Sequence, residues 1–394
     1  MNQPDKTIVY RLKRILYLLG IGLTVAISTF WLQHHNFDRL LATQANVANA
    51  ADFEFVENFP LGWIDRIERP KTPGKVAQEG INFLIPYTHQ NQYPQIKTYL
   101  DNAQKHGIKV FLEPYRESVE TADLVAVTDF IRTYKDHPAV AGWYAYDEPA
   151  VTKKVSPKTL EATYRAIKAE DTKHPVAVVF SSSQTRQIPL YWKAMDICMV
   201  DRYPLFFGKP EFNNLRNFRQ WMSKAAYAAG NKSFWPVLQG FGEQKNGKPK
   251  FKRRLPTATE EKYMFYTGIL AGADATVFYG HHWTRQSWVD KVLTPIITEF
   301  KGFQATIAKS NILENPLVNR RDMQAVLYRD PISRKYLLIA IHHGKGNIKA
   351  TISSRRLKAK NQIRVVGRNT SIKTKRGVFQ DSFTSYGVNI YEIS

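Results

Sequence analysis

The feature that most constrains the fold is a strand signal that recurs along the chain and is usually followed by an amphipathic helical pattern. Most of these strand segments are continuous apolar runs, which is typical of parallel strands covered on both faces. The predicted strands are Phe53–Glu57, Ile81–Pro86, Lys109–Glu113, Val140–Tyr146, Val176–Ser181, Ile197–Asp201, Phe234–Gln239 and Thr276–Tyr279. Eight such units predict an α/β fold whose strands close into a (β/α)₈ barrel, the TIM barrel.

A doubly wound open sheet is the alternative. It is weakened because no Gly-rich phosphate-binding loop follows an early strand. Helix signals support the alternating pattern: Ser156 and Pro157 form an N-cap and first turn, and Thr257 with Glu260 forms a capping box.

The pattern changes from about Met323 to strands without long helices. The segments Gln324–Tyr328, Tyr336–His342, Ile348–Ile352, Gln362–Val366 and Val388–Ile393 predict a small antiparallel β-module. The predicted organisation is therefore an N-terminal region (1–50), a barrel (51–320) and a sandwich-like C-terminal module (321–394).

The N-terminal region contains an uncharged, almost unbroken apolar stretch from Ile15 to Leu32, preceded by basic residues. This length is just sufficient for a transmembrane helix with a cytoplasmic N-terminus. The rival interpretations are a signal peptide cleaved near Ala50 and a buried helix of the fold. With an anchor or a signal peptide, the rest of the chain lies outside the cytoplasmic membrane, either membrane-anchored or secreted.

The formal net charge of +22 is concentrated toward the C-terminus, where basic residues greatly outnumber acidic ones after Pro331. Such a surface favours anionic partners, including an acidic carbohydrate or anionic lipid, although a solvated basic surface without a ligand remains the alternative. No RNA- or DNA-binding motif is present, so nucleic acid is not expected as a partner. The single cysteine, Cys198, lies in an apolar run and is predicted to be a core residue.

In a (β/α)₈ barrel the reacting groups lie at the C-terminal ends of the strands. Carboxylates and aromatic residues dominate those positions, a composition typical of a cleft that binds sugars. The predicted substrate-binding residues are Tyr87, Glu113, Tyr146, Tyr203, Gln239, Tyr279, His281 and Trp283. No metal or cofactor is expected, because the pairs His281-His282 and His342-His343 have no suitable companion ligands.

Several of these motifs, in this order, resemble those of the clan A glycoside hydrolases and their bacterial relatives. They are Gly142-Trp143-Tyr144-Ala145-Tyr146-Asp147-Glu148-Pro149, Asp201-Arg202-Tyr203-Pro204, Pro236-Val237-Leu238-Gln239-Gly240-Phe241-Gly242 and the ending around Phe379 to Val388. The resemblance covers about residues 51–394 and implies a carbohydrate substrate, with Glu148 as the proton donor. A polar strand-to-loop turn is the alternative interpretation of Asp147-Glu148-Pro149.

The resemblance also implies a second carboxylate at the end of the seventh strand, where this chain has Gln239. An amide cannot act as that nucleophile. Glu243 could enter from the following loop, or Asp201 or Glu113 could act as a base at about 6.5–9.5 Å from Glu148. The predicted catalytic set is therefore Glu148, Asp201 and Glu243. Two functions remain open: a glycosidase acting on an extracytoplasmic poly- or oligosaccharide, and an inactive carbohydrate-binding or envelope-assembly barrel.

Overall fold

The computed structural model describes residues 58–69, 71–88, 93–212, 214–242, 252–309, 312–357, 362–368 and 370–393. The predicted N-terminal anchor or signal segment lies outside these residues, as does Glu243. Within the described part of the chain, no helix is long and apolar enough to cross a membrane.

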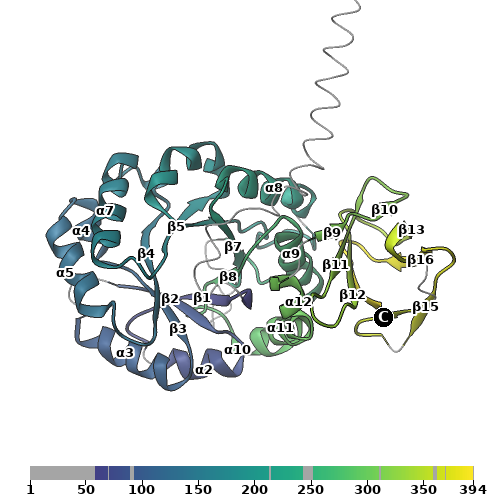
Figure 1. Ribbon diagram of the computed structural model, residues 1–394, viewed down its shortest axis with the longest axis horizontal. Coiled ribbons are helices and arrows are strands. Elements are labelled where there is room, and N and C mark those ends of the chain that lie inside the picture. Colours follow the sequence, from purple (N-terminus) through teal and green to yellow (C-terminus); the bar gives the residue numbers. More distant parts are fainter. Residues whose placement is uncertain are drawn as a thin grey trace, which may run out of the picture. The chain divides into compact units, whose positions relative to one another are not determined.

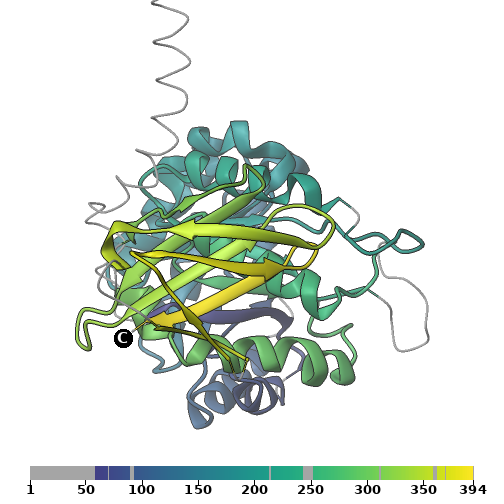
Figure 2. The same ribbon diagram turned by 90° about the vertical axis from the view of Figure 1, so that its right-hand side faces the viewer.

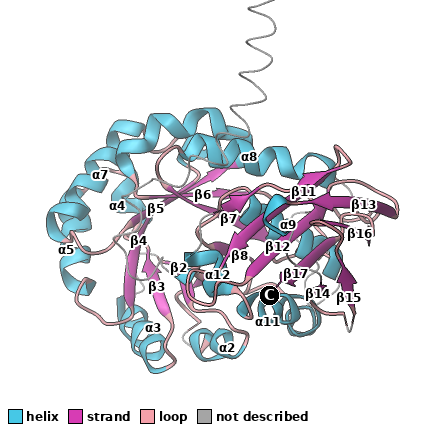
Figure 3. Ribbon diagram, turned by 45° about the vertical axis from the view of Figure 1, so that its right-hand side comes forward, coloured by secondary structure: helices cyan, strands magenta, loops and turns pink. Residues whose placement is uncertain are grey.

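Eight parallel strands close into a barrel in the order in which they occur in the sequence, as predicted (Figure 1). Helices surround the strands, as the colouring by secondary structure shows (Figure 3). The barrel strands are β1 (Leu61–Arg66), β2 (Phe83–Tyr87), β3 (Lys109–Leu112), β4 (Val140–Asp147), β5 (Val176–Ser181), β6 (Ile197–Asp201), β7 (Ser233–Gln239) and β8 (Thr276–Tyr279).

The helices of the barrel region are α2 (Thr72–Gln78), α3 (Tyr93–Lys105), α4 (Arg116–Glu120), α5 (Leu124–Tyr134), α6 (Pro149–Thr152), α7 (Pro157–Glu170), α8 (Phe218–Ala229), α9 (Ala258–Leu270), α10 (Gln286–Trp288), α11 (Thr294–Lys301) and α12 (Gln304–Lys309). Shorter or tighter helical segments are η4 (Ser182–Ala194), η5 (Leu215–Asn217) and η6 (Val289–Leu293). The predicted caps are present: the Ser156 side chain accepts from the Thr159 amide, and Thr257 and Glu260 form a capping box.

The first strand is not where the sequence pattern placed it. Strand β1 covers Leu61–Arg66, whereas residues 51–57, which include the predicted segment Phe53–Glu57, lie outside the described part of the chain. The true strand contains a glycine and two charges, which resemble a loop in the sequence. Gly62 is required because a Cβ there would lie 2.3 Å from the Phe83 ring inside the barrel.

Two apolar layers hold the barrel together. Its interior is filled by side chains such as Phe83, Phe111 and Trp235, whose rings meet edge-on or tilted at centroid distances of 5.2–5.7 Å. A larger layer lies between the strands and the helices and includes buried Cys198, as expected for a core cysteine. The interior is thus a packed core, which leaves the ends of the strands to form any site.

The C-terminal strands form two antiparallel sheets, which confirms the predicted antiparallel module (Figure 2). One sheet has the order β10-β13-β16 and the other has the order β15-β14-β17-β12-β11-β9. The strands are β9 (Ile312–Glu314), β10 (Leu317–Val318), β11 (Met323–Arg329), β12 (Tyr336–His342), β13 (Ile348–Ser353), β14 (Gln362–Val365), β15 (Ser371–Lys373), β16 (Val378–Phe383) and β17 (Val388–Ile393), with the short helical segment η7 (Arg355–Leu357). Strands β9 and β10 precede residue 321 and pair with β11 and β13, so the sheets begin earlier than the sequence pattern suggested.

The module packs on the barrel through α9. The Tyr263 hydroxyl on α9 lies 3.0 Å from His343 Nδ1, and its ring meets Tyr386 at 4.9 Å between centroids. His342 is buried, and its Nδ1 lies 2.9 Å from the Thr384 carbonyl oxygen. His343 therefore connects the module to the barrel, whereas His342 connects β12 to the segment after β16 within the module.

Candidate active site

The C-terminal ends of the barrel strands bring together most of the acidic and aromatic residues singled out in the sequence. The interior face at this end is closed by the partly buried rings of Tyr87, Tyr203 and Tyr279, which pack on the barrel core. The carboxylates of Glu113, Asp147, Glu148 and Asp201 follow strands β3, β4 and β6 at the same end. We call this region the mouth of the barrel.

The carboxyl groups of Glu148 and Asp201 lie close enough in the mouth for each to shift the pKa of the other. Ser181 acts on the pKa of Glu148 and Tyr203 on that of Asp201, in both cases lowering it. Burial and the negative charge of Glu148 raise the pKa of Asp201 well above its usual range. Burial and the charge of Asp147 raise the pKa of Glu148 as well, although the Asp201 and Ser181 side chains act in the opposite direction. Because two buried carboxylates side by side repel each other, the pair favours a state in which one proton is retained between them.

Glu148 reaches this position through an unusual backbone conformation. Its φ of 50° and ψ of 55° are left-handed, and its amide donates to the Val179 carbonyl oxygen at 2.9 Å. Pro149 begins helix α6 immediately afterwards. A left-handed glutamate costs free energy, and such residues are concentrated at functional sites.

Asp147 also faces the mouth, which strict strand alternation did not predict. The register between β4 and β5 shifts between Tyr144 and Tyr146, so two consecutive residues, Ala145 and Tyr146, join the outer layer. Tyr144 packs in the barrel interior and Asp147 follows on the same side. The shift explains why sequence reasoning placed Tyr146, and not Tyr144, at the site.

The Asp147 carboxylate belongs to a second, cation-balanced cluster. It accepts a hydrogen bond from the Tyr87 hydroxyl at 3.1 Å and lies 3.7 Å from Arg116. Arg116 donates from Nε and Nη2 to Glu113 Oε1 at 3.2 and 2.9 Å, and the other Glu113 oxygen accepts from the Thr88 amide at 2.9 Å. Although burial acts against the charged form, the two carboxylates raise the pKa of Arg116, which stays cationic. Arg116 therefore provides a permanent positive charge beside Asp147, and sequence reasoning had missed both residues.

Aromatic rings form the wall next to these acids. Tyr203 and Tyr279 stack with centroids 5.5 Å apart and an interplanar angle of 22°. Phe241 meets both rings edge-on at 5.0 and 5.4 Å, and Trp283 lies 5.6 Å from Tyr279. Predicted residues Tyr203, Tyr279 and Trp283 are thus brought together, and flat rings of this kind can stack on the apolar faces of sugars.

Three predicted substrate-binding residues are engaged elsewhere. Gln239 is fully buried: its Oε1 accepts from the Leu205 amide, and its Nε2 donates to the carbonyl oxygens of Leu205, Phe241 and Arg254 at 2.8–3.2 Å. Tyr146 points its hydroxyl at Glu120, 2.8 Å away, and therefore toward α4. The Gln239 amide therefore holds together the backbone segments around Leu205, Phe241 and Arg254, whose polar groups already satisfy it.

His281 is the third such residue. Its side chain is 1% exposed, and its ring nitrogens lie 3.9 Å from Asp65 and 3.7 Å from Glu79. Although burial opposes protonation, these two acids raise the pKa of His281. The histidine therefore links β1, the end of α2 and the segment after β8 in a buried ion cluster, where it is not accessible to a sugar hydroxyl.

Several solved structures with a similar architecture are glycoside hydrolases. One similar structure is a GH27 β-L-arabinopyranosidase from Geobacillus stearothermophilus, in complex with arabinose, with a TM-score of 0.62 and 10% identity over 88% of this chain and 99% of that one. The chain has the fold of a glycoside hydrolase. An Anoxybacillus α-amylase matches with a TM-score of 0.57 and 9% identity over 86% of this chain and 98% of that one.

A family 39 glycoside hydrolase from Bacteroides cellulosilyticus is also similar, with a TM-score of 0.52 and 10% identity over 86% of this chain and 82% of that one. No family model and no curated protein matches the sequence. The fold predicted from the motif resemblance is thus confirmed, whereas identities this low carry no residue roles.

Proposed function

We propose that the protein hydrolyses a glycosidic bond, with the Glu148–Asp201 pair as its acid and Asp147 as its second carboxylate. The observation that carries the proposal is the contrast between these groups, which lie side by side in one mouth. One pair shares a proton because burial and mutual repulsion disfavour a second charge. The other carboxylate has a cation at 3.7 Å. A proton-donating group and a second carboxylate at one site are what a glycosidase requires.

The reaction requires a proton for the leaving-group oxygen and a negative charge for the oxocarbenium-like transition state. Asp201 holds the shared proton and delivers it to the leaving-group oxygen as the glycosidic bond breaks, while Glu148 stays beside it. Water then adds to the anomeric carbon, and the proton that it loses restores the Glu148–Asp201 pair. Asp147 supplies the negative charge and is oriented by Tyr87 and Arg116. The motif resemblance assigned the proton donor to Glu148, and the proposal transfers that role to Asp201.

The first test is hydrolysis of a panel of aryl glycosides and polysaccharides by the wild-type chain and three variants, Asp147→Asn, Glu148→Gln and Asp201→Asn. We expect the first and third variants to lose about 10²–10⁴-fold in kcat, the usual contribution of a positioned acid or base. Asp129→Asn is the matched control, because this carboxylate is on the outer helix α5 with its side chain 62% exposed. It should leave the rate unchanged.

Equal rates for Asp201→Asn and the control would contradict the proposed acid. Binding of glycans without hydrolysis by the wild-type chain would instead favour the alternative, a barrel that binds carbohydrate and is catalytically inactive.

We also propose that the protein acts outside the cytoplasmic membrane, held by an N-terminal helix around Ile15–Leu32. The support is the length of this apolar stretch and the basic residues before it. Protease treatment of intact cells and of membrane vesicles tests this. Cleavage of the barrel only after the cytoplasmic membrane has been opened would contradict it.

A further inference from the structure

Two arginines near the mouth are held on aromatic rings. Arg202 directly follows Asp201, and its guanidinium lies 3.4 Å from the centroid of the Trp221 ring. Arg253 lies over Phe206 at 3.6 Å, and the backbones of these two residues form a β-bridge. Stacking holds a guanidinium plane while leaving the N–H groups at its edge free to bind.

No carboxylate among the described residues forms an ion pair with either arginine, and the Nε atoms of both are buried without a hydrogen-bond acceptor there. Within the described ranges, the Arg202 side chain has one hydrogen bond, from Nη1 to Ser182 Oγ at 3.5 Å. The next arginine in the chain behaves differently: Arg254 donates to both oxygens of Glu260 at 2.7 Å. Arg254 has the paired arrangement of a structural arginine, and the other two lack it.

The charges of the two residues also act on each other. Burial lowers the pKa of both, and the positive charge of Arg253 lowers that of Arg202 further, although the charge of Asp201 acts in the opposite direction. Bringing two cations together when no carboxylate of the described residues forms an ion pair with either of them destabilises the free protein. A bound anion would remove this cost and would gain charge-assisted hydrogen bonds.

Arg202 also lies next to the proposed acid pair on two neighbouring strands. It follows Asp201 on β6, and its contact Ser182 follows Ser181, which acts on the pKa of Glu148. An anion bound by Arg202 would therefore lie beside the end of β6, from which Asp201 also projects.

We propose that Arg202 and Arg253 form a subsite for an oxyanion substituent of the saccharide, so that the substrate is an acidic glycan and not a neutral one. This inference rests on the proposed function for its place in the reaction. As a binding site it stands on the two arginines, which form no ion pair with any carboxylate that the structure describes, and the basic net charge of +22 favours the same class of ligand.

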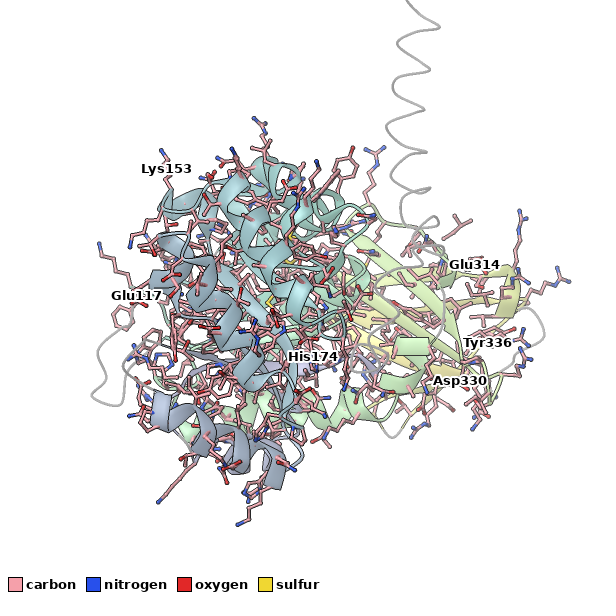
Figure 4. The ribbon with its side chains drawn as sticks, turned by 60° about the vertical axis from the view of Figure 1, so that its left-hand side comes forward. Glu117, Lys153, His174, Glu314, Asp330 and Tyr336 are labelled. Atoms are coloured by element: carbon pink, nitrogen blue, oxygen red, sulfur yellow. The ribbon has the colours of Figure 1, made fainter. Side chains whose placement is uncertain are left out.

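The experiment is a binding measurement with the full chain on immobilised glycans in matched sets: neutral, carboxylate-bearing, sulfate-bearing and phosphate-bearing. The double variant Arg202→Gln/Arg253→Gln is compared with the wild type and with Arg329→Gln. Arg329 is the matched control, because it lies over the ring of Tyr336 at 5.8 Å in the β-module, where Figure 4 labels Tyr336.

We expect the wild type and the Arg329→Gln control to prefer one acidic set over its neutral counterpart, and the double variant to lose at least about tenfold in affinity for that set, since hydrogen bonds to charged groups contribute this much. The set that is preferred identifies the anion. The midpoint of thermal unfolding of the free double variant should not fall, because two repelling cations are removed, and the preferred glycan should raise it only in the wild type and the control.

Equal binding of acidic and neutral glycans, absence of binding to every acidic set, or an equal loss in the Arg329→Gln control would overturn the subsite. Turnover separates this result from the proposed function. Acidic glycans that bind through the arginines but are never cleaved would contradict the glycosidase and keep the subsite. Cleavage of a neutral glycan that depends on Asp201 but not on the arginines would support the glycosidase and contradict the subsite.

Discussion

Strand β4 connects two groups of carboxyls whose environments are opposite. At its C-terminal end, Glu148 lies beside Asp201, and burial with like charge raises the pKa of both. Toward its other end, the Trp143 indole donates to Asp171 at 2.8 Å, and His174 Nδ1 lies 2.6 Å from the same oxygen. Although burial acts in the opposite direction, these bonds lower the pKa of Asp171 to about 2.

The two groups lie at opposite ends of the barrel, because the strands are parallel and His174 precedes β5 whereas Glu148 follows β4. Figure 4 labels His174 and, at another edge of the barrel, Lys153 from the segment after β4. The same barrel therefore stabilises the negative charge of Asp171, which has a structural role, and disfavours a negative charge on Asp201 at the proposed site. The comparison indicates that the buried like charges at the mouth lower the stability of the fold, whereas the hydrogen-bonded Asp171 at the opposite end raises it.

The largest expected effect is on the mouth. Asp201→Asn should reduce kcat by about 10²–10⁴-fold while leaving the free energy of unfolding unchanged or raised, because a buried like-charge pair is relieved. Steady-state kinetics and urea unfolding of the same preparation measure both quantities. A large loss of stability would remove the contrast between the two groups.

Gln239→Glu comes next and tests the assignment at strand β7. The substitution removes the amide donor from three carbonyl oxygens and should lower the free energy of unfolding by about 3 kcal/mol without increasing activity. Chemical unfolding and kinetics check it. Increased hydrolysis would instead mean that this position can serve as the second carboxylate.

Asp171→Asn should destabilise the fold by about 2–3 kcal/mol, because Trp143, His174 and two backbone amides lose a charged acceptor. Specific activity of the folded fraction should not change. In the wild type, this carboxylate contributes stability that is present above the unfolded-state pKa of about 4 and is lost as the pH falls toward about 2. Acid unfolding curves that coincide for the variant and the wild type would contradict this.

The smallest effect concerns pH. The proposed acid must be protonated, so kcat/KM should fall as the pH rises through the raised pKa of Asp201. Because the charge of Glu148 helps to raise that pKa, Glu148→Gln should move the alkaline limb of the residual activity to lower pH. A limb that stays in place would show that Glu148 does not act on the titrating group.

The sequence predicted the barrel well where strands are apolar runs with clear ends: β5, β6 and β8 have the predicted bounds. It misplaced β1, because Gly62, Asp65 and Arg66 are residue types that are typical of loops. In the structure, Gly62 packs against Phe83 and Asp65 lies beside His281. Alternation failed at Tyr146 because a register shift is invisible without the partner strand.

The candidate site shows the same division. Glu148 and Asp201 were predicted from their places at strand ends, whereas the mutual effect on their pKa values and the left-handed backbone at Glu148 were not. Arg116 could not be predicted either, because its role arises from Glu113 and Asp147 on two different strands.

The most direct test of the central claim, that Asp201 is the proton donor in this mouth, is the dependence of kcat/KM on the leaving group. A series of aryl glycosides whose phenols differ in pKa would be hydrolysed by the wild type and by Asp201→Asn. We expect a shallow dependence in the wild type and a steep one in the variant, with near-normal rates only for the most acidic phenols, since these need no proton. Parallel dependences, with the variant slowed equally for every phenol, would contradict the account.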